Sequence, residues 1–245
     1  MFGRNKIAKV AAEFLGTGVL TLLVLSVQRS TIGVPFFVAM TAGLTVALLV
    51  VALGRSSGAH LNPAVTVALW TARKVATLEA AVYLVAQLVG AWVAYYLYTY
   101  LVNNTLQSVG GHYSSHILVA EAVGGVVLGL GWATAVYHQA TNGVKAVIVG
   151  VAYMLAIVAA SSAAIGLVNP ALALGTRAWV WGTYVLGPVL GVVIGVNLYG
   201  LLFAPANAFA RAGARTSSTR VASTTSTKAA STKKTTTKKK TTRKK

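Results

Sequence analysis

The sequence predicts an all-α membrane protein with six transmembrane helices and two short re-entrant helices in an inverted repeat. Three observations lead to this fold class. Hydrophobic residues occupy 56% of the 245 positions, which is more apolar side chain than one water-soluble core buries. Six continuous apolar runs each approach the roughly 20 residues that cross a bilayer. The tripeptide Asn-Pro-Ala occurs twice, at 62–64 and 169–171.

The six predicted spans cover 7–27, 35–54, 78–101, 117–137, 144–162 and 181–203. Helices are favoured over the strands of a membrane barrel, because such strands alternate polar and apolar residues over about ten positions. The first span follows a basic segment, but it has no clear small-residue cleavage site, so we expect it to be retained as a helix. Glycines recur in the fourth and sixth spans, which predicts close helix packing.

Positive charge predicts the orientation, since Lys and Arg accumulate in short cytoplasmic loops. If residue 1 is inside, only Arg29 and Arg177 lie outside among the 21 Lys and Arg residues. We therefore expect an integral plasma-membrane protein with both termini in the cytoplasm. Residues 206–245 are rich in Lys, Thr and Ser, which predicts a disordered basic tail. Such a tail is either simply solvated or in contact with anionic lipid, and nucleic acid is an unlikely partner, because the tail lacks interleaved aromatic residues.

An internal repeat divides residues 1–205 into halves at about 7–104 and 115–203. Asn62 and Asn169 are 107 residues apart, and Glu13 and Glu121, each early in a half, are 108 residues apart. Each half contains three full spans, an odd number, so the second half enters the membrane from the opposite side and the repeat is inverted.

Each Asn-Pro-Ala tripeptide predicts a helix start, because Asn caps the first turn and Pro at the first helical position loses no hydrogen bond. The ten or so apolar residues that follow reach only about 15 Å, half of a membrane. Two opposed helix tips, each with about half a positive charge, disfavour cations at the midplane. The Asn amides can donate to a solute oxygen, so the arrangement favours neutral hydrogen-bonding solutes.

Four segments carry a resemblance to a known family: residues 12–17, 57–65 and 86–91, and Gly187-Pro188 with Gly191. Together with the two tripeptides, Asn62-Pro63-Ala64 and Asn169-Pro170-Ala171, they resemble the aquaporin and glycerol-facilitator family of major intrinsic proteins. The resemblance implies a passive channel for water or small neutral solutes such as glycerol, a homotetramer with one pore in each protomer, and no cofactor. It also implies a polar track of backbone carbonyls from Gly58, Ala59, His60, Ile165, Gly166 and Leu167.

The outer constriction departs from the family pattern. Most members have an arginine three residues after the second Asn, where this chain has Leu172. The other three constriction positions correspond to Ala42, Ile157 and Gly166, so the ring is predicted to be wide and apolar. We favour a permissive pore for neutral solutes, and the alternative is an apolar ring that dewets and slows water. Ala173 matches neither the Ser of water channels nor the Asp of glycerol facilitators.

Glu13 and Glu121 are intramembrane carboxylates, which serve either as proton relays or as structural acceptors. Their repeat symmetry favours a structural role, in which they accept hydrogen bonds from the re-entrant loops. His60 is expected to hold its loop, with pH sensing as the lesser alternative. The other histidines have no ligand-like spacing, so no metal site is predicted.

Two other classes of protein are compatible with parts of the pattern. A secondary transporter also uses inverted repeats and broken helices, but the only candidate ion-coupling groups at the midplane are Glu13 and Glu121, so a channel is favoured. An enzyme is not expected, because no nucleophile, metal cluster or reactive carboxylate pair is apparent.

Overall fold

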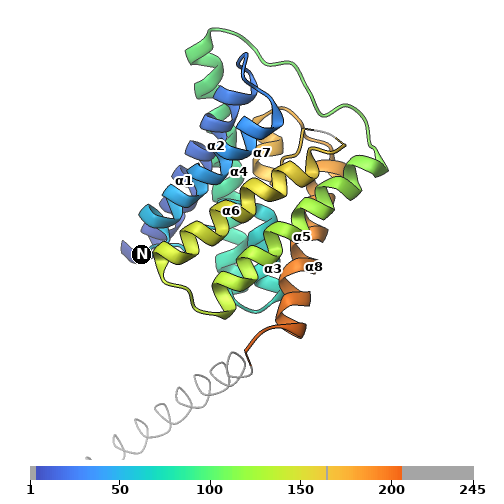
Figure 1. Ribbon diagram of the computed structural model, residues 1–245. Coiled ribbons are helices and arrows are strands. Elements are labelled where there is room, and N and C mark those ends of the chain that lie inside the picture. Colours follow the sequence, from blue (N-terminus) through green and yellow to red (C-terminus); the bar gives the residue numbers. More distant parts are fainter. Residues whose placement is uncertain (1–3, 164, 206–245) are drawn as a thin grey trace, which may run out of the picture. The chain divides into compact units, whose positions relative to one another are not determined.

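The computed structural model describes residues 4–163 and 165–205 (Figure 1). This part of the chain contains six long helices, a π-helical turn and two short helices. The predicted sixth span is formed by the π-helical turn together with the helix that follows it. The elements in chain order are α1 (Arg4–Gln28), α2 (Pro35–Leu53), α3 (Pro63–Thr71), α4 (Thr77–Val102), α5 (Ser115–Tyr137), α6 (Asn142–Ala160), α7 (Pro170–Gly175), η1 (Trp181–Val185) and α8 (Leu186–Leu202).

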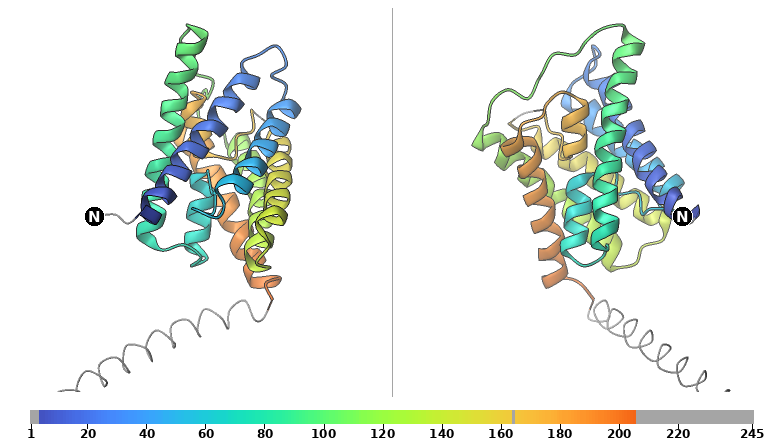
Figure 2. Two further views of the ribbon diagram at one scale, coloured as in Figure 1. Left: turned by 90° about the vertical axis from the view of Figure 1, so that its left-hand side faces the viewer. Right: turned by 180° about the vertical axis from the view of Figure 1, so that it is seen from behind.

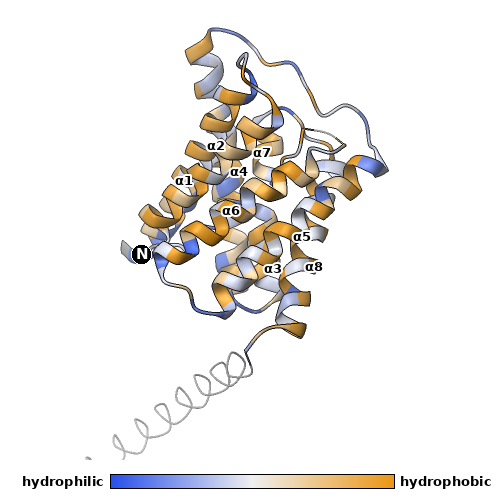
Figure 3. Cartoon of the chain, viewed as in Figure 1, coloured by the Kyte–Doolittle hydropathy of each residue, from blue (hydrophilic) through white to orange (hydrophobic). Residues whose placement is uncertain are grey.

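Six helical segments of the described chain are long and apolar enough to cross a membrane. Their ends differ from the predicted spans by a few residues at most. Hydrophobic residues run along the whole length of these helices (Figure 3), and large side chains such as Leu44, Leu48 and Leu101 are exposed on the outside of the bundle. An exposed apolar surface of this kind requires a lipid environment. The six-span, all-helical fold class predicted from the sequence is confirmed.

The two halves of the bundle interlock through their short helices. Helix α3, from the first half, packs against α8 of the second half, and α7 packs against α4 of the first. The helix pairs α1 with α4 and α5 with α8 repeat the same contact in the two halves, and α2 packs against α6 between them. Figures 1 and 2 show α3 and α7 extending toward opposite ends of the bundle.

An arginine in the left-handed region lies two residues after the end of each short helix. Arg73 has φ 57° and Arg177 has φ 65°, and the residue after each donates its N–H back to a helix carbonyl, from Lys74 to Leu69 at 2.8 Å and from Ala178 to Ala173 at 2.8 Å. This is the usual hydrogen-bonding pattern of a helix C-terminus. Helix α7 has six residues and is therefore shorter than the ten or so that the sequence suggested, because the chain turns back at Arg177.

Glycines allow the long helices to approach one another closely. A methyl group on Gly191 would overlap the backbone carbonyl of Ala122, and one on Gly129 would lie 2.7 Å from the carbonyl oxygen of Val192. The two positions lie on α8 and α5, where the sequence shows recurrent glycines. Close backbone packing of this kind drives helix association in lipid, where the hydrophobic effect between helices is absent.

Candidate functional site

Each Asn-Pro-Ala tripeptide begins a short helix. Asn62 and Asn169 are the N-caps of α3 and α7, with extended backbones at φ −156° and −153°. The side-chain oxygen of each accepts a hydrogen bond from the backbone N–H two residues on, at 2.8 Å from Ala64 and at 2.9 Å from Ala171. The proline in each first turn has no N–H that would need a partner. The tripeptides therefore cap their helices by the same local geometry.

The two helix tips hold each other through reciprocal hydrogen bonds. Nδ2 of Asn62 donates to the carbonyl oxygen of Val168 at 2.8 Å, and Nδ2 of Asn169 donates to that of Leu61 at 3.0 Å. All four residues are completely buried. Residues 107 positions apart in the chain therefore meet inside the bundle, tip to tip.

The residue before each asparagine has a strained backbone. Leu61 has φ 54° and Val168 has φ 50°, a left-handed conformation that costs a residue with a Cβ about 1–2 kcal/mol. This turn directs the carbonyl of each residue toward the opposite asparagine. A strained backbone of this kind persists only where contacts with the surrounding structure hold it in place.

Buried carboxylates supply that restraint. Glu13 accepts hydrogen bonds from the backbone N–H groups of His60 at 3.0 Å and Leu61 at 2.8 Å, and from the Ser57 hydroxyl at 2.6 Å. In the second half, Glu121 accepts from the backbone N–H groups of Leu167 at 2.8 Å and Val168 at 2.7 Å. Each carboxylate therefore binds the segment that precedes the asparagine of its own half.

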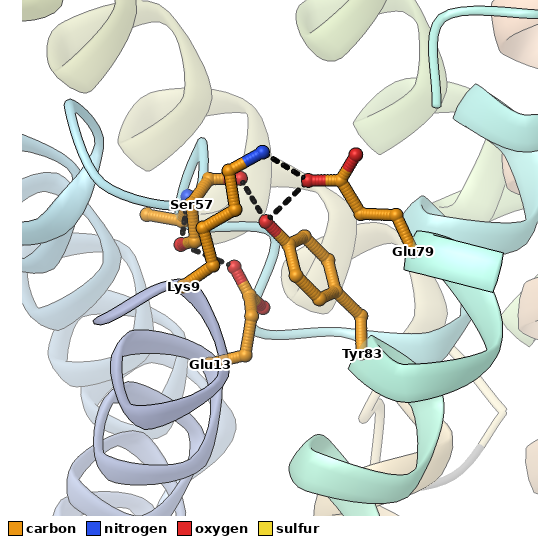
Figure 4. Close-up of polar contacts among 6 residues, drawn as sticks. Lys9, Glu13, Ser57, Glu79 and Tyr83 are labelled. Carbon is orange, nitrogen blue, oxygen red and sulfur yellow. Dashed lines mark hydrogen bonds and ion pairs between the residues drawn. The ribbon is translucent and has the colours of Figure 1, made fainter. Parts of the chain in front are cut away.

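A polar network extends from Glu13 to the end of the bundle (Figure 4). Tyr83 donates from one hydroxyl toward two acceptors, the Ser57 carbonyl and the Glu79 carboxylate, each at 3.0 Å. Glu79 is also paired with the Lys9 ammonium at 2.6 Å. The first re-entrant loop is therefore tied to α1 and α4 by both backbone and side-chain contacts.

His60 is packed within the same loop. Its Nδ1 lies 3.2 Å from the Thr66 hydroxyl, and its ring makes edge contacts with Tyr83 and Trp132 at centroid distances of 5.4 and 5.5 Å. A ring held on three sides positions the loop backbone, whose carbonyls at Gly58, Ala59 and His60 are the first half of the predicted track.

One carbonyl of the predicted track already has a partner. The Gly58 carbonyl oxygen accepts a hydrogen bond from Nζ of Lys145 at 2.7 Å, and the same ammonium lies 4.5 Å from the Trp132 ring centroid. In the second half of the track, which comprises Ile165, Gly166 and Leu167, Gly166 has φ 58°, and a methyl group there would lie 2.6 Å from the Ile157 carbonyl oxygen. Close contact with α6 therefore requires glycine at this position.

The residues of the predicted outer constriction are apolar and tightly packed. Ala42 and Leu172 have no exposed surface and Ile157 is 1% exposed, and the three belong to one buried cluster. Gly166 lies against the carbonyl of Ile157, as described above. These three side chains therefore form part of the buried core of the bundle.

The structure also places residues at the site that the sequence analysis did not single out. Tyr153 on α6 contacts Asn169, with its hydroxyl 2.9 Å from Nδ2, and Lys145, two turns earlier on α6, contacts Gly58. Helical spacing could have identified Tyr153, because it lies one turn before the predicted constriction residue Ile157 on the same face of α6. Tyr153 lies on that face beside Asn169, beyond the constriction positions that the family pattern indicates.

The sequence analysis expected the paired asparagines to line an aqueous path. The structure brings them together, but neither Asn62 nor Asn169 has exposed surface. The two amides instead contact the opposite loop and, for Asn169, the Tyr153 hydroxyl.

A family model described as "Major intrinsic protein" matches residues 3–199. The chain belongs to the major intrinsic protein family. The resemblance drawn from the Asn-Pro-Ala motifs is therefore confirmed, as is the prediction of a passive channel. Membership in a channel family also supports the expectation that the protein is not an enzyme, and it favours a channel over a secondary transporter.

Members of the major intrinsic protein family from several lineages are similar to this chain. The probable aquaporin AqpM of Archaeoglobus fulgidus is 31% identical over 188 residues, which are 68% of this chain and 76% of that protein. Aquaporin Z of Photorhabdus laumondii is 28% identical over 226 residues, 80% of this chain and 97% of that protein. The solved structure of the aquaglyceroporin from Plasmodium falciparum has the same fold, with a TM-score of 0.68 at 21% identity over 82% of this chain and 98% of that one.

Proposed function

We propose that this channel conducts water and small neutral solutes such as glycerol, down their gradients, past the paired asparagines. The reciprocal pairing of Asn62 and Asn169 is the observation that carries the proposal. Two helix N-termini, each with about half a positive charge, point at one another in a site of low dielectric constant. That arrangement disfavours cations and leaves neutral molecules with hydrogen-bonding oxygens as the fitting solutes.

The same proposal assigns roles to the residues around the asparagines. Glu13 and Glu121 act as structural acceptors, which is supported by their hydrogen bonds to the backbone of the re-entrant loops. The carbonyls of the two loops form the polar track along which a solute exchanges hydrogen bonds. An irregular backbone at membrane depth is tolerated only where protein buries it or where it lines a wet cavity. The proposed track consists of Gly58, Ala59, His60, Ile165, Gly166 and Leu167.

We place the outer constriction at Ala42, Ile157, Gly166 and Leu172. None of these side chains carries a charge, so this ring would select by size and by its affinity for water, without the electrostatic selection of an arginine. A permissive ring passes glycerol and urea together with water, whereas a dewetted ring slows all three. We favour the permissive ring because the side chains at Ala42 and Gly166 are small.

A vesicle shrinkage assay tests the proposal. The full chain is reconstituted in proteoliposomes, and water efflux and the uptake of glycerol and urea are followed by light scattering. We expect water permeability above that of protein-free vesicles and non-saturating glycerol uptake. A rate equal to that of protein-free vesicles for every solute would overturn the channel proposal. Saturable uptake that disappears when a proton gradient is removed would instead identify a coupled transporter.

The assembly and orientation proposed for the channel follow from its family and charge distribution. We propose a homotetramer with one pore in each protomer, in the plasma membrane, with both termini in the cytoplasm. The proposed tail, residues 206–245, lies outside the described residues. Its basic composition is suited to contact with anionic lipid, worth about 1 kcal/mol per charge near the surface. Vesicle flotation with the full chain and with a chain ending at residue 205 tests this contact, and equal binding to anionic vesicles would contradict it.

A further inference from the structure

Tyr153 lies at the meeting point of the two asparagines. Its hydroxyl is 2.9 Å from Nδ2 of Asn169, and it is also close enough to the Asn62 side chain to interact with it. The side chain comes from α6, which belongs to neither re-entrant segment, and only 1% of the residue is exposed. A single phenol oxygen therefore lies beside both amides that are proposed to receive a solute.

The hydrogen-bond donors of Asn169 are fully used. Its amide has two N–H groups, of which one donates to the Leu61 carbonyl at 3.0 Å and the other to the Tyr153 hydroxyl at 2.9 Å. A passing solute oxygen needs the second of these donors, because the first holds the helix tips together. The Tyr153 hydroxyl therefore occupies the position in which a solute oxygen would be bound.

The Tyr153 side chain is one of the groups that pack over the buried asparagines. Asn62 and Asn169 have no exposed surface, and the carbonyl-bearing residues Leu61 and Val168 are equally buried. The helix tips and loops are held by Glu13 and Glu121, so they are restrained against separation. The Tyr153 side chain carries no such restraint beyond its hydrogen bonding to the asparagines and its packing.

We propose that Tyr153 limits both the rate and the size of the solutes that pass the paired asparagines. This inference rests on the proposed channel function. In the arrangement described, the phenol closes the path, and a solute passes when the ring moves away and the solute oxygen takes over the Asn169 donor. The midplane then adds a second selection by size to that of the outer constriction, because a small solute needs a smaller displacement of the Tyr153 ring than glycerol does.

Three variants separate this role from that of the outer constriction. Tyr153→Val removes the ring, Tyr153→Phe keeps the ring and removes the hydroxyl, and Ile157→Val trims the constriction one turn away on the same helix. Tyr98→Phe, which removes the hydroxyl of a buried tyrosine on α4, is the matched control. Each full-length variant is reconstituted in phosphatidylcholine vesicles at an equal protein-to-lipid ratio, and water and glycerol permeability are measured by light scattering.

We expect Tyr153→Val to raise both permeabilities, with the larger increase for glycerol. Tyr153→Phe should raise water permeability by up to about tenfold, the factor that one neutral hydrogen bond is worth, and should raise glycerol permeability less than Tyr153→Val does. Tyr98→Phe should resemble the wild type, and Ile157→Val should raise glycerol permeability less than Tyr153→Val does.

The inference is overturned if the wild type conducts and Tyr153→Val matches it for both solutes, an outcome that leaves the proposed channel function in place. It is also overturned if Ile157→Val, and not Tyr153→Val, raises glycerol permeability. Vesicles in which neither the wild type nor any variant conducts would overturn both the inference and the channel function. Helical circular dichroism and thermal unfolding of each variant in detergent establish that the compared proteins are folded.

Discussion

The ammonium group of Lys145 donates a hydrogen bond of 2.7 Å to the carbonyl oxygen of Gly58. This contact joins the first turn of α6 to the loop that leads to Asn62, at the same end of the bundle as the loop between α3 and α4. The carbonyl belongs to the proposed polar track, so a fixed positive charge lies at one entrance of the proposed path. The predicted constriction near the other entrance has Leu172 in place of an arginine.

The first prediction concerns cation exclusion by this charge. A fixed cation at a narrow entrance repels other cations, so replacing Lys145 with Gln should raise the leak of K⁺ through reconstituted vesicles. Lys74→Gln is the matched control, because Lys74 is also a lysine over an aromatic ring, 4.3 Å from the Tyr137 centroid, but lies on a surface loop. Potassium flux is measured with an ion-selective electrode. Equal leaks in the two variants would contradict a role for Lys145.

A second prediction tests the structural role of the buried carboxylates. In Glu121→Gln, an amide NH₂ group replaces one of the two carboxylate oxygens that accept hydrogen bonds from the backbone N–H groups of Leu167 and Val168. One buried donor then loses its partner, which destabilises the protein by about 1–3 kcal/mol. The loss should appear as a lower midpoint of thermal unfolding in detergent.

Glu79→Gln is the control for that substitution. Glu79 pairs with Lys9 in a partly exposed ion pair, with side-chain exposures of 31% and 42%, and such pairs contribute only about 0–1 kcal/mol. We therefore expect a smaller drop in the unfolding midpoint for Glu79→Gln than for Glu121→Gln. The reverse order would contradict the proposed anchoring of the second loop by Glu121.

A third prediction concerns the packing of α5 against α8. A methyl group on Gly191 overlaps the backbone carbonyl of Ala122, and a backbone cannot move aside as a flexible side chain can. Gly191→Ala should therefore destabilise the protein by about 1–3 kcal/mol, the usual cost of overpacking. Gly143→Ala is the control, because a methyl group there meets nothing within 4 Å. Thermal unfolding of both variants is the measurement, and equal midpoints would be inconsistent with close α5–α8 packing.

The fourth prediction tests the outer constriction. Leu172→Arg introduces a large charged donor into the ring, which should lower glycerol and urea permeability relative to water. Leu172→Met keeps an apolar side chain of similar volume and serves as the control. Shrinkage rates of reconstituted vesicles provide the comparison. If Leu172→Arg folds and its ratio of glycerol to water permeability equals that of the wild type, Leu172 does not line the constriction.

The local features of this protein were predictable from the sequence. The six spans depend on the hydropathy of runs of about 20 residues, and the caps at Asn62 and Asn169 depend on a side chain and an N–H only two residues apart. The inverted repeat followed from the parity of the spans between the two tripeptides. The length of α7 was less predictable, because its end at Gly175 depends on a left-handed turn at Arg177 that the apolar pattern does not specify.

Some features of the site depend on contacts between distant segments. Tyr153 and Lys145 are single residues on an apolar helix, and their hydrogen bonds to Asn169 and Gly58 depend on how α6 packs against the two re-entrant segments. The filling of the predicted constriction likewise depends on how side chains from several elements interdigitate. Residue identity at four positions indicated that the ring is apolar, but not how tightly it is packed.

The sequence by itself determined that this chain spans a membrane six times and that two capped helix tips enter from opposite sides, because hydropathy, capping and span parity are properties of contiguous residues. Only the tertiary structure decided that the tips bind each other's carbonyls and that a phenol from a third helix covers them. Hydrogen bonds of this kind require atoms to lie within about 3 Å, and for residues as far apart in the chain as Asn62 and Val168 that distance is set by packing of the whole bundle.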